Sequence, residues 1–404
     1  MIGCTKLLCE CGTVSAALHE EVAASDPRLM GFCNDLRPLV VWNTTRRCNL
    51  ACEHCYLDAQ DCVGGKELTT EQAREFIADL GKMKVPVLLL SGGEPMLRHD
   101  LYDLIRMSNE AGVRPVLSTN GMLVTPEAAH SLREAGIRYV GVSLDGMREI
   151  HDDFRGQQGA FDAAVAGIKH SLAEGMHTGV RFTVNAKNYE DLGPLLDFIR
   201  ELGVPRFCMY HLVYAGRGDV SMDLTHEQSR EVIDTIIGRT LKYDREGGGL
   251  EILTVDNPAD GISIYEHVKR ETPERAEQVY GLLGQHGGCS AGMKIANVDP
   301  EGNVHPCQFW TGAILGNVRE RPLSEIWADE SNPLLSALRH REEHLQGICA
   351  DCAHRAVCGG CRVRALAVSG DAWAEDPACY LTERERHGGP GAPTVVGAGQ
   401  AAGA

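Results

Sequence analysis

Arg46-Arg47-Cys48-Asn49-Leu50-Ala51-Cys52-Glu53-His54-Cys55-Tyr56 carries three cysteines separated by three and then two residues. It follows a short apolar run, 39–42, that predicts a buried β-strand, so the cysteines should lie in the loop that leaves this strand. A [4Fe–4S] cluster normally takes four thiolates, so three close cysteines leave one iron for another ligand. The alternative, a zinc knuckle, would need four ligands in a closed tetrahedron. The spacing therefore predicts a cluster with one open iron.

The composition limits the classes of protein to consider. A chain of 404 residues with 43% hydrophobic content exceeds the usual size of one domain, so two domains are expected. The formal net charge of −17 would repel phosphate backbones, and no strong basic patch stands out, so no nucleic-acid partner is predicted. The sequence shows neither eighteen consecutive apolar residues nor a signal peptide, so we expect no membrane span and a cytoplasmic location.

The 16 cysteines cluster as C-x2-C pairs, which fits metal or cluster ligation better than disulfides in a reducing compartment. Four of them lie in an N-terminal extension of uncertain structure, residues 1–37: Cys4, Cys9, Cys11 and Cys33. They are extra ligands or free thiols, and free thiols are the favoured interpretation.

Short apolar strands alternate with amphipathic helices, which predicts an α/β fold with a parallel sheet. Capping boxes at Thr69 with Gln72 and at Thr225 with Gln228 mark two helix starts, Asp100 can cap a third, and Thr125-Pro126 starts a fourth. The six predicted strands are 39–42, 87–90, 115–118, 139–144, 180–184 and 207–212.

The rest of the chain divides by composition. Residues 244–284 are expected to form a polar bridging segment with some helix, and 285–387 a cysteine-rich, glycine-punctuated second domain. Residues 388–404 are rich in Gly, Ala and Pro and should be a disordered tail.

Small and polar residues follow the predicted strands at the rim where α/β barrels place their sites. Gly92-Gly93-Glu94-Pro95 follows the second strand: glycines let backbone approach a ligand closely, and Glu94 offers an acceptor to an ammonium group. Asn120 and Ser143 follow the third and fourth strands. Taken alone, each of these segments is an ordinary tight turn.

The cysteine spacing at Cys48, Cys52 and Cys55 resembles the signature of radical SAM enzymes. The resemblance implies that S-adenosylmethionine chelates the free iron, and that its reductive cleavage yields a 5′-deoxyadenosyl radical. It also implies a partial (β/α)6 TIM-like barrel over residues 38–243, with cofactor contacts from Gly92, Gly93, Glu94, Pro95, Asn120 and Ser143.

Seven later cysteines resemble the pattern of the SPASM extension, which binds one or two auxiliary [4Fe–4S] clusters. By that resemblance Cys349, Cys352, Cys358 and Cys379 share one cluster, while Cys289, Cys307 and Cys361 serve another. No cysteine shortly upstream of Cys289 completes the second set, so the second cluster has an open or non-cysteine ligand, or is absent. A structural zinc ribbon is the alternative.

Segments flanking the first cysteines, 40–50 and Glu53-His54-Cys55, resemble the haem-pathway branch of the radical SAM/SPASM family. The resemblance implies removal of two acetate side chains from 12,18-didecarboxysirohaem to give iron-coproporphyrin III, with flavodoxin or ferredoxin as electron donor. The alternatives within the family are haem d1 biosynthesis and maturation of a ribosomal peptide.

A carboxylate-bearing iron tetrapyrrole would need local cations on so acidic a chain. Four candidates follow predicted strands on the rim side: His151, Arg155, His211 and Arg217. Arginine can grip carboxylates with two parallel hydrogen bonds. The competing interpretation is that these residues are structural or solvated charges.

Overall fold

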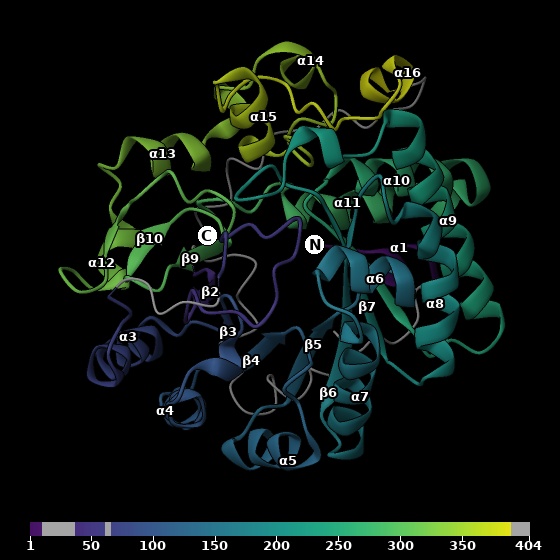
Figure 1. Ribbon diagram of the computed structural model, residues 1–404. Helices are drawn as coiled ribbons and strands as arrows, with labels where there is room; N and C mark the ends of the chain where they lie inside the picture. Colours follow the sequence, from purple (N-terminus) through teal and green to yellow (C-terminus); the bar gives the residue numbers. More distant parts are fainter. Residues whose placement is uncertain (10–36, 61–65, 389–404) are drawn as a thin grey trace.

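The computed structural model describes residues 1–9, 37–60 and 66–388 (Figure 1). Cys11 and Cys33, and the tail beyond Gly388, lie outside these residues.

One continuous sheet of 11 strands runs through the described residues, in the order β1-β8-β7-β6-β5-β4-β3-β2-β9-β10-β11. Strands β2 to β8 are parallel neighbours, β9 pairs in parallel with the other side of β2, and β1 pairs antiparallel with β8. The strands are β1 Ile2–Gly3, β2 Leu39–Asn43, β3 Val87–Ser91, β4 Arg114–Thr119, β5 Tyr139–Ser143, β6 His177–Val184, β7 Arg206–His211, β8 Glu251–Val255, β9 Ile295–Val298, β10 Asn303–His305 and β11 Gly316–Asn317. The six predicted strands are all present.

Helices lie around the outside of the curved sheet, as expected of a partial barrel (Figure 1). The barrel helices are α3 Thr70–Met83, α4 Leu101–Glu110, α5 Pro126–Ala135, α6 Arg148–Arg155, α7 Ala160–Ala173, α8 Leu192–Glu201 and α9 His226–Arg245. The others are α1 Cys4–Cys9, α10 Ala259–Glu271, α11 Ala276–His286, α12 Leu323–Ala328, α13 Pro333–Arg339, α14 Gly347–Ala350, α15 Arg362–Ser369 and α16 Glu383–His387.

The helix starts follow the predicted chemistry with one exception. Both capping boxes form, and Thr125 accepts a hydrogen bond from the Ala128 amide. Asp100 makes no side-chain cap, because its carboxylate is bound by Arg98 Nε at 2.7 Å and Thr70 Oγ1 at 2.7 Å.

The core lies between the strands and the helices that cover them. Each of the five strands from β2 to β6 contributes a fully buried side chain: Trp42, Leu88, Leu117, Val140 and Phe182. Full burial of one such side chain contributes about 1.5–3 kcal/mol, so apolar strands of four to six residues are enough to hold the sheet together.

The segment 244–284 contains α10 and most of α11, but it also contributes a strand that was not predicted. Glu251–Val255 forms β8 and pairs with β7, so the sheet continues past residue 243. The strand was not predicted because it carries polar residues near both ends. Glu251 accepts a hydrogen bond from Arg206 Nε at 2.7 Å, and Thr254 is fully buried.

The described part of the N-terminal extension is ordered. β1 pairs with β8, and α1 packs against α9 and α10. Cys4 is fully buried and Cys9 packs against the core, and burial raises the pKa of the Cys4 thiol, as expected of a structural thiol.

None of the helices in the described ranges is both long and apolar enough to cross a bilayer.

Candidate cluster and cofactor site

The first cysteine loop leaves β2 and is held in place by backbone hydrogen bonds. Cys48 and Cys52 are buried and Cys55 is half-buried. The Cys48 amide donates to Gln60 O at 3.1 Å, and the Glu53 amide donates to Phe154 O at 3.1 Å. The loop thus presents three closely spaced thiols at the C-terminal end of a buried strand.

Cys48 and Cys52 are buried thiols, and Cys52 lies beside a positive charge. Burial raises the pKa of Cys48 to about 12 and also raises the pKa of Cys52, although Arg155 opposes the shift at Cys52. Arg155 Nη1 donates to Cys52 Sγ at 3.4 Å. Thiolates in so buried a place need a positive partner, and iron supplies one as it displaces the protons.

The glycines of Gly92-Gly93 approach the cysteine loop itself. The Gly93 amide donates to Thr45 O at 2.8 Å and the Glu94 amide to Arg47 O at 2.7 Å. A Cβ on Gly93 would lie 2.1 Å from Arg47 O. We predicted that the glycine backbone would closely approach a ligand. In the structure it closely approaches the residues that precede Cys48.

Gly93→Ala is expected to displace the Arg47 backbone and to lower the iron bound at the first cysteines at least tenfold relative to the parent protein. Gly238→Ala is the matched control, because a Cβ at Gly238 on α9 meets nothing within 4 Å. The measurement is iron and sulfide content after anaerobic reconstitution. Parent-like content in Gly93→Ala would show that the loop tolerates the displacement.

Glu94 ties two rim loops together. Its carboxylate is fully buried and accepts hydrogen bonds from Thr119 Oγ1 at 2.8 Å, the Asn120 amide at 2.8 Å and the Met96 amide at 3.0 Å. Burial raises the pKa of Glu94 against these hydrogen bonds. Oε1 accepts two of these hydrogen bonds and Oε2 accepts one, so Oε2 keeps an acceptor site and the predicted ammonium contact stays a prediction.

The other predicted cofactor residues lie at the same rim. Asn120 Nδ2 donates to Asn49 Oδ1, inside the cysteine loop, at 2.8 Å, and Pro95 is buried at the start of a short 3₁₀ turn. Ser143 ends β5, half-buried, opposite Arg181 of β6 in the strand register. Their cofactor contacts stay predictions.

Arg155 lies under the cysteine loop in a buried ion pair. Its guanidinium binds Asp145 and Cys52 Sγ, and Asp145 also accepts from the Thr183 amide at 2.8 Å. Burial would raise the pKa of Asp145, but Arg155 and His54 lower it below its ordinary value. The structural salt bridge, the competing interpretation of Arg155, is the one observed.

The other three predicted substrate cations are also bound by the protein. His151 Nδ1 accepts from the Asp145 amide at 3.0 Å, and burial lowers the pKa of His151 to about 4, so it is neutral near pH 7. His211 Nε2 bonds Asp260 Oδ2 at 2.9 Å. Arg217 Nε donates to Cys52 O at 2.9 Å and its Nη1 to Asp58 Oδ1 at 2.7 Å. All four residues are therefore bound within the protein, and Arg155 and Arg217 hold the cluster loop; their contacts with a substrate stay predictions.

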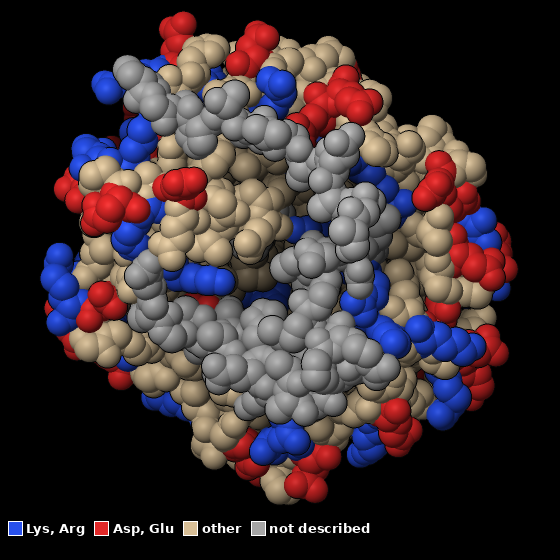
Figure 2. Space-filling view, turned by 180° about the vertical axis from the view of Figure 1, so that it is seen from behind, with Lys and Arg blue, Asp and Glu red and all other residues tan. Residues whose placement is uncertain are grey.

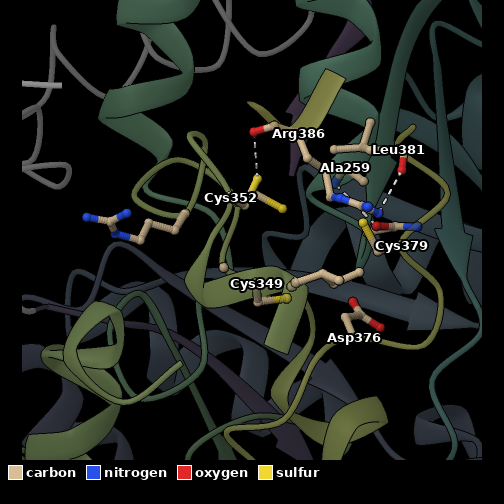
Figure 3. Close-up of a pocket in the computed structure, with 13 residues that line it drawn as sticks. Ala259, Cys349, Cys352, Asp376, Cys379, Leu381 and Arg386 are labelled. Carbon is tan, nitrogen blue, oxygen red and sulfur yellow. Dashed lines mark hydrogen bonds between the residues drawn. The ribbon is translucent and has the colours of Figure 1, made fainter. Parts of the chain in front are cut away.

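Four of the later cysteines line one pocket (Figure 3). They come from α14 and the loops around it and are Cys349, Cys352, Cys358 and Cys379. The pocket thus brings together the four thiols that the family resemblance assigns to the first auxiliary cluster.

The remaining three thiols gather elsewhere. Cys289, Cys307 and Cys361 belong to one apolar cluster with Val213 and Trp310. Burial raises the pKa of Cys361 to about 12. These thiols are grouped as the predicted second auxiliary set.

Two family models match the chain. The Radical SAM superfamily model matches residues 42–199, and an iron–sulfur cluster-binding domain model, SPASM, matches residues 289–353.

Among curated proteins, the chain is 47% identical to a protein named Fe-coproporphyrin III synthase from Methanosarcina barkeri, over 95% of this chain and 98% of that relative. It is 44% identical to a protein named pre-heme d1 synthase from Dinoroseobacter shibae, over 86% of this chain and 87% of the relative. An AdoMet-dependent heme synthase of Methanosarcina barkeri is 35% identical over 84% of this chain and 95% of the relative.

Among solved structures, SuiB of Streptococcus suis bound to S-adenosylmethionine aligns with a TM-score of 0.68 at 18% identity, over 92% of this chain and 84% of that chain. Native anSMEcpe with bound AdoMet aligns with a TM-score of 0.66 at 19% identity, over 85% of this chain and 94% of that chain. At this identity the likeness shows the shared fold.

Proposed function

The chain belongs to the radical SAM superfamily and carries a SPASM domain, and from this premise we propose that it removes two acetate side chains from 12,18-didecarboxysirohaem to give iron-coproporphyrin III. The observation that carries the proposal is the 47% identity to Fe-coproporphyrin III synthase along nearly the full length of both chains. The protein is a radical SAM enzyme of haem biosynthesis, with a [4Fe–4S] cluster that binds S-adenosylmethionine and with auxiliary iron–sulfur clusters.

In this proposal Cys48, Cys52 and Cys55 would hold the first cluster, which would donate the electron that splits S-adenosylmethionine into methionine and the 5′-deoxyadenosyl radical. The chain fixes the position of that loop: Gly93 and Glu94 bind the backbone before Cys48, Arg217 binds the backbone of Cys52, and Arg155 donates to the Cys52 sulfur. A hydrogen bond to a cluster thiolate raises the reduction potential, so Arg155 also eases the uptake of an electron. A low-potential flavodoxin or ferredoxin is the proposed donor of that electron.

The substrate's carboxylates need cations that the protein has not already paired. Within the described residues, Arg47 and Arg181 each keep a buried guanidinium Nε without a hydrogen-bond partner. Arg181 Nη1 donates to Ser118 Oγ at 2.8 Å, and Arg181 lies beside Ser143 in the sheet register. Lys and Arg atoms are also visible in the hollow at the centre of the face in Figure 2. Among the described side chains Arg155 Nε and Arg217 Nη2 have no hydrogen-bond partner either, so we assign Arg47 and Arg181 to the substrate carboxylates together with these two predicted residues.

The test is anaerobic incubation of the reconstituted protein with S-adenosylmethionine, a reductant and 12,18-didecarboxysirohaem, followed by mass analysis. The expected products are 5′-deoxyadenosine and iron-coproporphyrin III. Loss of propionate instead of acetate side chains would assign the chain to haem d1 biosynthesis, which the 44% identity to pre-heme d1 synthase makes the second candidate. Unchanged tetrapyrrole beside turnover of a precursor peptide would reject both.

A further inference from the structure

Arg362 carries a fully buried positive charge. It is the first residue of α15, directly after Cys361, and it is completely shielded from solvent. Within the described residues its guanidinium takes part in no ion pair, and its Nε has no hydrogen-bond partner. A buried charge without a partner costs several kcal/mol, so Arg362 calls for a negative group nearby.

The neighbouring charged side chains do not neutralise Arg362. Arg364, two residues further along α15, is also fully buried and binds both oxygens of Asp376, each at 2.9 Å. Asp376 also accepts from the Cys361 amide at 2.6 Å and from the Ala378 amide at 3.1 Å. Two guanidinium groups and one carboxylate therefore leave this buried group with one positive charge in excess.

The Arg362 guanidinium lies against the pocket of the first auxiliary cysteine set. Its Nη2 donates to Cys349 Sγ at 3.9 Å. A Cβ on Gly360, which lines the same pocket, would lie 2.6 Å from Arg362 Nη2 and 2.7 Å from Asp376 Cβ. Figure 3 shows Cys349 and Asp376 among the residues that line this pocket. The excess charge is thus next to the site where a cluster would be held.

We propose that Arg362 compensates the negative charge of the first auxiliary cluster, the one assigned to Cys349, Cys352, Cys358 and Cys379, and raises its reduction potential. A cluster held by four thiolates is an anion, and reduction adds one more negative charge. A buried cation beside it therefore stabilises the reduced form more than the oxidised form. The inference rests on the auxiliary cluster and does not depend on the substrate of the proposed function.

The contact with Cys349 becomes stronger once the cysteine is a cluster ligand. A neutral thiol is a weak acceptor, which agrees with the long distance of 3.9 Å. A thiolate is charged, and hydrogen bonds to charged acceptors are roughly twice as strong as those between neutral groups. Hydrogen bonds to the sulfurs and net charge both set the potential of iron–sulfur clusters, and Arg362 supplies both.

A structural clamp is the competing role of Arg362. Its Nη1 donates to Ala372 O at 2.9 Å and to Ala374 O at 2.7 Å, and both carbonyls belong to the loop that leads to Cys379. A clamp needs the forked shape of the guanidinium, whereas charge compensation needs its positive charge. Substitutions that keep one property and remove the other separate the two roles.

The experiment uses full-length protein in which Cys48, Cys52 and Cys55 are all replaced by Ala, so that the spectra report the auxiliary clusters alone. On this background we compare Arg362 with Arg362→Gln, which removes the charge, and Arg362→Lys, which keeps it. Arg384→Gln is the matched control, because it removes the same charge from an exposed residue of α16. Iron and sulfide are counted after anaerobic reconstitution, and EPR follows a redox titration of each protein.

Arg362→Gln is expected to keep its iron and to lower the potential of one auxiliary cluster. At the midpoint potential of the background protein, the ratio of reduced to oxidised cluster should fall about tenfold, which is a shift of about 59 mV for one electron. Arg362→Lys should stay within about threefold of the background, because it keeps the charge. Arg384→Gln should stay within about threefold as well, because water screens an exposed charge.

The outcome is decided even where Arg362→Gln does not hold the cluster. Iron retained in Arg362→Lys but lost in Arg362→Gln would support charge compensation, since lysine lacks the fork that grips two carbonyls. Iron lost in both variants would leave Arg362 as a clamp and overturn the proposal. Full iron with an unchanged potential in Arg362→Gln would overturn it too. Both negative results leave the proposed reaction standing, because acetate removal by the parent protein is measured separately.

Discussion

Simultaneous replacement of Cys48, Cys52 and Cys55 by Ala is expected to abolish reductive cleavage of S-adenosylmethionine to 5′-deoxyadenosine. The three thiols lie on the loop after β2 and are the proposed ligands of the first cluster. Iron should fall by about four per chain while the iron of the C-terminal domain stays. Product analysis and iron counting on the same samples check both statements.

Cys208→Ala is the control, since Cys208 is a buried cysteine on β7 that belongs to none of the cluster sets. It should cleave the cofactor like the parent. Cleavage that survives the triple replacement would refute the assignment of the first cluster. Zinc in place of iron and sulfide in the triple variant would favour the ribbon interpretation of the C-terminal cysteines.

Arg155→Met is expected to remove the first cluster almost as completely as the triple cysteine replacement, although it leaves all three thiols in place. It leaves Asp145 buried without its ion-pair partner, which costs about 3–5 kcal/mol. It also removes the donor to Cys52 Sγ. Cofactor cleavage should therefore fall roughly 100-fold, in proportion to iron lost from the first site, while the auxiliary iron stays.

The pH dependence separates this cause from a lost substrate contact. The folded-state pKa of Asp145 is lowered, so the pair stabilises the parent above the ordinary carboxyl pKa and the stabilisation is lost as pH falls through the folded value. Arg155→Met should lack this loss of stability on acidification. Asp145→Asn added to Arg155→Met should restore most of the urea midpoint, because no unpaired buried charge is then left. If Arg155→Met kept its cluster and its stability and lost only tetrapyrrole affinity, the substrate role predicted from sequence would be correct.

The sequence predicted the elements whose signals are local. Three cysteines after an apolar strand, capping boxes at Thr69 and Thr225, and alternating strands and helices each depend on neighbouring residues, and the structure has them. The grouping of the C-terminal cysteines came from the family resemblance, and the pocket lined by Cys349, Cys352, Cys358 and Cys379 agrees with it.

The partners of charged side chains could not be predicted in the same way. Arg155 and Arg217 were placed on the correct rim, but sequence does not show that Asp145 and Asp58 reach them first. Strand β8 carries Glu251, whose partner Arg206 comes from β7, and the buried Thr254, and so it looked like a polar linker.

Strand β2 lies between β3 of the barrel and β9 of the C-terminal domain, paired in parallel with both. The strand that delivers the first cysteine loop is therefore shared by both domains, and no hinge separates them there. Electron tunnelling slows exponentially with distance, so the main-chain hydrogen bonds on both sides of β2 would keep constant the spacing between clusters held by the two domains. Any adjustment to a bulky substrate would then fall to the loops at the rim.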